Sequence, residues 1–143
     1  MRRTVSLLLA AAGPLAFPLS QMGYGSLERL AVLMVLPAAT GLVAIGWWDG
    51  RRSSAVVGSL LARGALWGTL ATFALETIRY PGFRLGFMPG NLPRLMGVLL
   101  LDRFAQGPSL LSDLAGFGLH FWTGACFGMI LTLASPRRGH IRA

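Results

Sequence analysis

Ionisable side chains are scarce in this 143-residue chain, and four of them, including Arg63, fall within long apolar segments. Glu76 lies near the end of one such segment, and Asp113 and His120 lie seven residues apart in another. Because seven residues make nearly two turns of an α-helix, Asp113 and His120 share one helix face. Ionisable groups in apolar spans are costly, so they mark candidate sites. We expect Glu76, Asp113 and His120 to line one cavity, with Arg79 at its rim.

Four roles are open for this set of side chains. Two carboxylates and an imidazole suit a divalent transition metal, although their spacing is not a known ligand signature. His120 supplies a single axial haem ligand, so a second imidazole would require a dimer. The three groups also suit the transfer of protons or ions. The structural alternative is that His120 hydrogen-bonds a neighbouring helix and the acids pair with arginines. The sequence favours this last role, and we predict no cofactor.

Both apolar segments carry small residues at four-residue spacing. This spacing keeps side chains on one face of a helix, and glycines on such a face let two helices approach closely. We therefore expect the two helices to pack antiparallel, one small-residue stripe against the other. The stripes are Gly64, Gly68, Thr72 and Glu76 in the first segment, and Gly116, His120, Gly124 and Gly128 in the second.

The composition places these segments in a membrane. The chain is 54% hydrophobic and 13% charged, whereas soluble domains carry about 25% charged residues. Three segments reach the roughly 20 residues that cross a hydrocarbon core, and a shorter fourth candidate lies near the N-terminus. The sequence predicts an all-α, polytopic bundle, one transmembrane domain over residues 1–143, with spans at about residues 4–20, 30–48, 54–78 and 110–134.

The first span has a second interpretation. Arg2 and Arg3 followed by an apolar run show the order of regions of a secretory signal peptide. The alanines at 10–12 come early for a cleavage site, and no small-x-small pattern follows the rest of the apolar stretch. We expect a retained helix, with a cleaved signal as the alternative.

The basic residues set the expected orientation. All 13 are arginines, and the net charge is +8. They lie between apolar runs rather than on one polar face, so nucleic acid is not an expected partner. The positive-inside rule then places both termini in the cytoplasm. The expected inside residues are Arg2, Arg3, Arg51, Arg52, Arg137, Arg138 and Arg142, and the outside residues are Arg29, Arg79, Arg84, Arg94 and Arg103.

The outer loop, residues 79–109, is long and apolar. Its Pro81, Gly82, Gly86, Pro89 and Gly90 are expected to break any helix. Asn91 is then expected to cap a short helix with Pro93 in its first turn, continuing to Phe104. That helix is too short to span, so it lies on the membrane surface or re-enters the membrane. Four loop arginines, Arg79, Arg84, Arg94 and Arg103, are candidates for binding an anionic ligand or a lipid head group.

The run His120-Phe-Trp-Thr-Gly124-Ala-Cys-Phe-Gly128 resembles the last helix of small uncharacterised bacterial four-helix membrane proteins with a His-x3-Gly-x3-Gly face. The resemblance covers about a third of the chain. It implies a multi-pass protein of the bacterial inner membrane and no particular chemistry.

Two functions from different classes follow. The first is a non-catalytic accessory subunit or assembly partner of a membrane complex, or a homo-oligomer. It rests on the small size, the glycine stripes and the lack of a catalytic motif. The alternative is an outward-facing intramembrane site at Glu76, Asp113 and His120, covered by the arginine-rich loop, that binds an ion, a metal or an anionic lipid-like ligand. Expected partners are membrane lipid and other membrane subunits or further copies of the chain.

Overall fold

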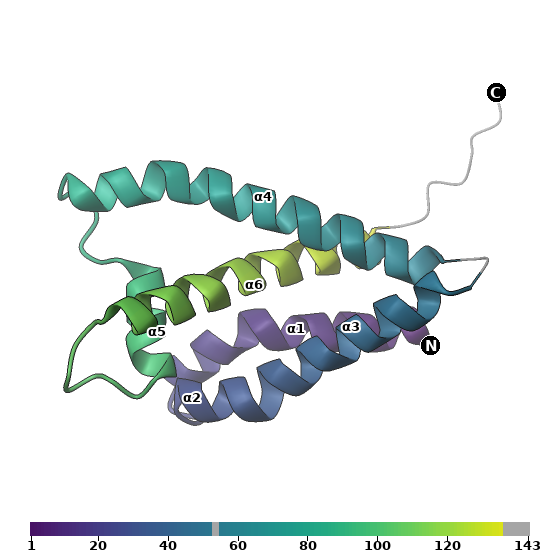
Figure 1. Cartoon of the computed structure of the whole chain (residues 1–143), viewed down its shortest axis with the longest axis horizontal. Coiled ribbons are helices and arrows are strands. Elements are labelled where there is room, and N and C mark those ends of the chain that lie inside the picture. Colours follow the sequence, from purple (N-terminus) through teal and green to yellow (C-terminus); the bar gives the residue numbers. More distant parts are fainter. Residues whose placement is uncertain (53–54, 136–143) are drawn as a thin grey trace.

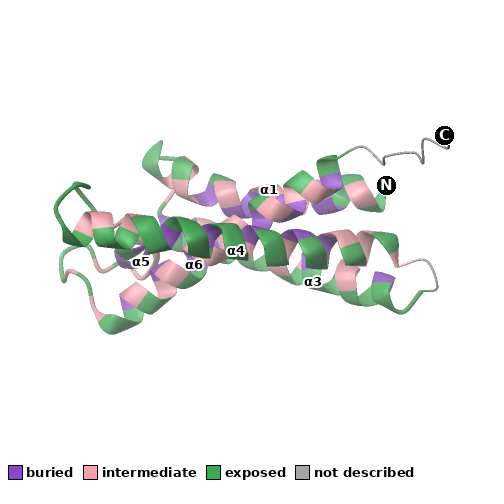
Figure 2. Cartoon of the chain, turned by 90° about the horizontal axis from the view of Figure 1, so that it is seen from above, coloured by how far each residue is buried: buried purple, intermediate pink, exposed green. Residues whose placement is uncertain are grey.

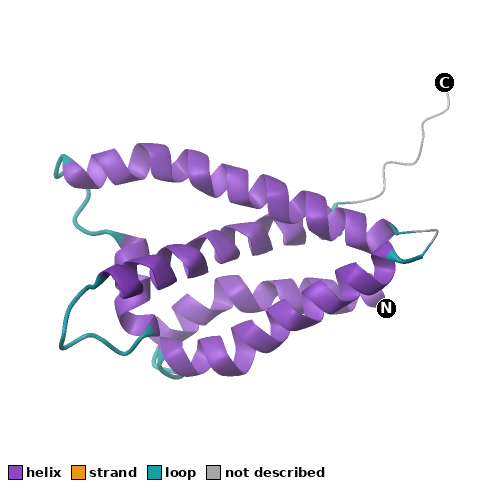
Figure 3. Cartoon of the chain, viewed as in Figure 1, coloured by secondary structure: helices purple, strands orange, loops and turns teal. Residues whose placement is uncertain are grey.

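The computed structural model describes residues 1–52 and 55–135 of the chain. The expected first residue of the third span, Ser54, and three of the arginines (Arg137, Arg138 and Arg142) lie outside these ranges. The described residues form helices and loops and no strand (Figure 3). The helices are α1 (Arg2–Gln21), α2 (Leu27–Leu30), the π-helix η1 (Ala31–Val35), α3 (Leu36–Gly50), α4 (Val56–Arg84), α5 (Leu92–Leu100) and α6 (Leu110–Ala134).

Four helical stretches are long and apolar enough to cross a membrane. The stretch of α2, η1 and α3 is one continuous helix, because the backbone passes through the π-helical turn without a break. The all-helical fold and the number of possible spans agree with the sequence prediction. The four stretches are Arg2–Gln21, Leu27–Gly50, Val56–Arg84 and Leu110–Ala134.

Helix α6 lies at the centre of the bundle and packs on α4, α5 and α1 (Figure 1). Helix α3 packs on α1 and α4. Helix α1 begins, and α6 ends, at one end of the bundle, while α5 lies crosswise at the other. Buried residues form strips along the long helices, and the remaining helix surfaces are exposed (Figure 2). Many exposed side chains are large and apolar.

Helix α1 meets α6 through small residues. An added Cβ at Gly13 would lie 2.8 Å from the sulfur of Cys126, so the glycine is required for this close approach. Cys126 is fully buried here. At the start of α1, the Arg3 guanidinium donates to the carbonyls of Leu133 and Ser135. These carbonyls lie in the last turn of α6, where no intrahelical donor remains for them.

The expected helix break at Pro81 and Gly82 is wrong. Helix α4 continues through both residues to Arg84. Proline removes one backbone hydrogen bond and crowds the preceding turn, but here it does so near an exposed helix end. The helix ends at Arg84, and two residues later Gly86 has a φ of +80°, a left-handed conformation suited to glycine.

The structure has a short helix α5 in the segment 79–109, and it ends earlier than expected. The Asn91 side chain accepts from the backbone N–H of Arg94 at 3.3 Å, and Pro93 lies in the first turn. The helix ends at Leu100 rather than Phe104, because Asp102 adopts a φ of +47°. A left-handed residue cannot continue a right-handed helix.

Candidate functional site

Two rows of small residues bring the backbones of α4 and α6 together. Apart from Leu61, the buried residues of α4 are Gly64, Gly68, Thr72 and Glu76, four residues apart. A Cβ on Gly68 would overlap the Gly124 carbonyl oxygen, and a Cβ on Gly128 would overlap that of Gly64. A Cβ on Gly124 would overlap the Thr72 hydroxyl. The two helices therefore pack antiparallel in near backbone contact, and the next α4 residue in the row is Glu76.

The Glu76 carboxylate is held on its own helix by Arg79. Arg79 Nε donates to Oε1 at 2.7 Å, and the guanidinium Nη2 donates to Oε2 at 3.0 Å. The two side chains are only 9% and 14% exposed. This two-bond geometry is the strong form of an arginine–carboxylate pair.

His120 lies across the interface from this pair. Its Nε2 is 2.9 Å from Glu76 Oε1, and its side chain is 13% exposed. Although the atoms are close, Nε2 makes no aligned hydrogen bond to any described residue. The structure thus brings Glu76, Arg79 and His120 into one buried polar cluster. Helix α4 supplies the carboxylate and the guanidinium, and α6 supplies the imidazole.

Asp113 does not join the polar cluster. Its Oδ1 lies 3.1 Å from Arg94 Nε of α5, with the side chains 29% and 47% exposed. Across residues 1–52 and 55–135, no three His, Cys, Asp or Glu side chains lie close enough to hold a metal ion. Within these ranges, the structure brings Glu76 and His120 together and pairs Asp113 with α5 instead.

Helix α5 is the reason for this separation. A Cβ on Gly116 would overlap the Pro93 carbonyl oxygen, and a Cβ on Gly97 would overlap that of Ser112. Helix α5 thus occupies the face of α6 where the expected stripe packing placed α4. Gly116 is a packing residue for α5, and of the three glycines in the α6 stripe only Gly124 and Gly128 lie against α4.

The four arginines of the 79–109 segment do not converge on one site. Arg79 pairs with Glu76, and Arg94 pairs with Asp113. Arg84 and Arg103 form no ion pair within the described part of the chain. The positive charge of this segment is thus partly neutralised by acids on α4 and α6.

Asp49 is a buried charged residue that the sequence reasoning did not single out. Its Oδ2 accepts from the Gly58 N–H in the first turn of α4 at 2.8 Å, and its Oδ1 lies 3.5 Å from Arg2. It thus links the ends of α1, α3 and α4. The available signal was an acid placed directly after an apolar run and just before the end of the span. Next to it, Arg51 lies over the Trp47 ring at 3.4 Å from its centroid.

Comparison of the chain with models of protein families, with curated proteins and with solved structures finds no match. What the chain does must therefore be inferred from its own residues and their geometry.

Proposed function

We propose that this chain is a multi-pass protein of the bacterial inner membrane that works as a non-catalytic subunit, joining other membrane subunits or further copies of itself. Its four long helices are the spans, and α5 lies in the outer interface. The observation that carries the proposal is the polar cluster. Its carboxylate is already held by a two-bond arginine pair and an adjacent imidazole, so its charges serve to fix α4 against α6.

The exposed surface supports an assembly role. Long helices with large apolar side chains facing outward require lipid or partner helices around them. Such side chains lie on η1, α4 and α6 alike; examples are Leu33, Trp67, Phe73 and Leu131. With only 13% charged residues, the chain offers little polar surface for binding a soluble substrate.

The arginine distribution supports termini in the cytoplasm. Arg2, Arg3, Arg51 and Arg52 lie at the end of the bundle where α1 begins, and three more arginines follow α6 in the sequence. Short segments rich in arginine beside spans stay in the cytoplasm. Reporter fusions at either end of the chain should both read cytoplasmic, and a periplasmic signal from either would contradict this topology.

A short amphipathic α5 supports an interfacial position. Pro93, Met96, Gly97 and Val98 are buried against the bundle, whereas Leu92, Leu95 and Arg94 face outward. A nine-residue helix is about 13 Å long, far short of the hydrocarbon thickness. It fits the level of the lipid head groups, where Arg84 and Arg103 would meet phosphates.

Purification from membranes in a mild detergent tests the subunit role. We expect the intact chain to migrate as a defined oligomer or with a constant protein partner. Gly124→Leu, which forces α4 from α6, should abolish that assembly, and His120→Ala should retain it. A stoichiometric metal or a haem spectrum in the purified protein would contradict the proposal.

A second candidate function is proton binding by the Glu76 and His120 pair. The specific observation in its favour is the 2.9 Å approach of Nε2 to the carboxylate without an aligned hydrogen bond to another described residue. Vesicles carrying the protein and an internal pH dye would then show proton flux that His120→Ala removes. Equal flux in the two proteins would exclude this function.

A further inference from the structure

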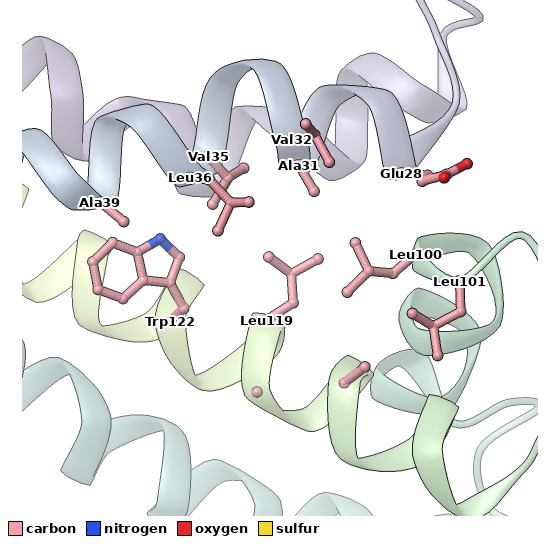
Figure 4. A pocket seen from close by; sticks show the side chains of 12 residues that line it. Glu28, Ala31, Val32, Val35, Leu36, Ala39, Leu100, Leu101, Leu119 and Trp122 are labelled. Atoms are coloured by element: carbon pink, nitrogen blue, oxygen red, sulfur yellow. The ribbon is translucent and has the colours of Figure 1, made fainter.

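A second feature lies away from the polar cluster: an apolar groove of about 660 Å³ on another face of α6. One wall comes from α2, η1 and α3, and the other from α5 and α6 (Figure 4). The groove exists because α3 packs on α1 and α4, and because residues of both walls are small. Ala31 and Ala39 line one wall, and Gly118 lines the other. An added Cβ at Gly118 would meet nothing within 4 Å.

The π-helical turn forms part of the first wall. Ala31 and Val35 belong to η1 and both line the groove. A π-turn widens the helix by one residue, and such turns occur frequently at functional sites. Here it shapes the wall directly beside Glu28.

The groove is polar at one end and apolar along its length. Glu28 lies at one end and Trp122 at the other, with the Trp122 ring reaching toward Ala39 (Figure 4). The Glu28 carboxylate makes no ion pair with any residue that the structure describes. Between the two ends, the side chains that face the groove are aliphatic.

The length of the groove corresponds to one membrane leaflet. From Glu28 to Ala39 the helix advances eleven residues, about 16 Å at the α-helical rise. This is close to half of the roughly 30 Å hydrocarbon core. In the topology proposed above, Glu28 lies at the outer surface and Trp122 near the middle of the membrane.

We propose that this groove binds one acyl chain of an amine-headed phospholipid from the outer leaflet, with the ammonium group at Glu28. The inference rests on the membrane placement in the proposed function. A single chain fits because the groove ends at Trp122, whereas a partner helix would have to continue through the other leaflet. The unpaired carboxylate selects an ammonium group and repels a purely anionic head group.

Fluorescence quenching tests the occupant. The full chain with Trp47, Trp48 and Trp67 replaced by Phe keeps Trp122 as its only indole. It is placed in phosphatidylcholine vesicles that contain a minor fraction of either phosphatidylethanolamine or phosphatidylglycerol with identical brominated chains. We expect brominated phosphatidylethanolamine to be about two- to fivefold more effective in quenching Trp122, as for an exposed ion pair.

Two variants separate the head group from the chain. Glu28→Gln should make the two brominated lipids equally effective. Gly118→Leu, whose Cβ meets nothing within 4 Å and whose side chain adds bulk to the groove wall, should reduce quenching by both, while the exposed Ala74→Leu on α4 should leave it unchanged. Equal quenching by both lipids in the parent protein, or no effect of Gly118→Leu, would overturn the inference. Quenching that rises as protein is diluted in lipid would also overturn it, because a second copy would then be the occupant.

A reporter with Trp67 alone distinguishes the failure of this inference from failure of the membrane placement. Trp67 is exposed on α4, so any brominated lipid should quench it without a head-group preference. If neither Trp67 nor Trp122 is quenched, the chain is not in the bilayer, and the proposed function is wrong together with the groove. If only Trp122 escapes quenching, the groove assignment alone is wrong.

Discussion

Removal of the Glu76 carboxylate should destabilise the bundle far more than removal of the other acid on the same side. In Glu76→Ala, the Arg79 guanidinium loses both of its hydrogen bonds, at 2.7 and 3.0 Å, and remains beside the buried His120. Breaking a buried ion pair at one partner costs about 3–5 kcal/mol, because the other charge is left uncompensated. Arg79 lies within two turns of the end of α4 and can extend toward the surface, so we expect about 3 kcal/mol.

The part of this loss of unfolding free energy that comes from the uncompensated Arg79 charge should be recovered when that charge is also removed. If Arg79→Leu is added to Glu76→Ala, no buried charge remains on α4, and an apolar replacement of a buried pair is often nearly neutral. We expect the double variant to be about 2 kcal/mol more stable than Glu76→Ala, about 30-fold in the unfolding equilibrium constant. Asp113→Ala is the matched control. Its pair with Arg94 is largely exposed, so its loss should cost less than about 1 kcal/mol.

Unfolding of the purified protein in mixed micelles, titrated with sodium dodecyl sulfate and followed by circular dichroism, measures these differences. The reasoning is refuted if the double variant is less stable than Glu76→Ala. It is equally refuted if Glu76→Ala and Asp113→Ala cost the same, because the buried and exposed pairs would then be equivalent.

Gly124→Leu should lower the unfolding free energy in the same titration by about 2 kcal/mol or more, since its Cβ overlaps the Thr72 side chain of α4, while Gly118→Leu, whose Cβ lies in open space, should change it little. Gly97→Val should speed amide exchange throughout α5, because the helix must leave α6. Gly90→Val, with open space around it, should not, and equal exchange in the two would contradict the packing argument. Asp49→Ala should lower the unfolding free energy by about 1 kcal/mol, because the hydrogen bond that caps the start of α4 is lost. Asp49→Asn should keep most of that stability, since its amide oxygen can still accept the bond. An equal loss in both would show that the charge, and not the hydrogen bond, matters.

The sequence was sufficient to predict the helices that can span a membrane, because their length and apolar composition follow from the hydrocarbon thickness alone. The ends of those helices were less predictable. Pro81 and Gly82 have strong local preferences against helix, yet α4 includes both. The end of α4 at Arg84 depends on the left-handed backbone of Gly86 that follows it, and several glycines in this segment were equally suited to that conformation.

The contact between α4 and α6 at the candidate site was predictable from the sequence, but the effect of the third helix, α5, was not. The four-residue spacing placed Glu76 and His120 on facing stripes, and the structure brings them within 2.9 Å. The seven-residue separation of Asp113 and His120 placed Asp113 on the same face as His120. No periodicity on α6 could reveal that α5 would fold back onto Gly116 and supply Arg94 as the partner of Asp113.

The +8 net charge therefore has different consequences at the two ends of the bundle. At the α5 end, five arginines oppose four acids, a net charge of only +1, and two of the arginines are in ion pairs. At the other end, the described arginines Arg2, Arg3, Arg51 and Arg52 oppose Asp49 alone, a net charge of +3. In the proposed topology this arginine cluster keeps that end in the cytoplasm. A strongly anionic ligand at the α5 end has support only from the three arginines that form no ion pair with a described residue, Arg29, Arg84 and Arg103. Glu28 lies at one end of an apolar groove about as long as one membrane leaflet is thick, and its unpaired carboxylate favours a cationic head group there instead. The five arginines are Arg29, Arg79, Arg84, Arg94 and Arg103, and the four acids are Glu28, Glu76, Asp102 and Asp113.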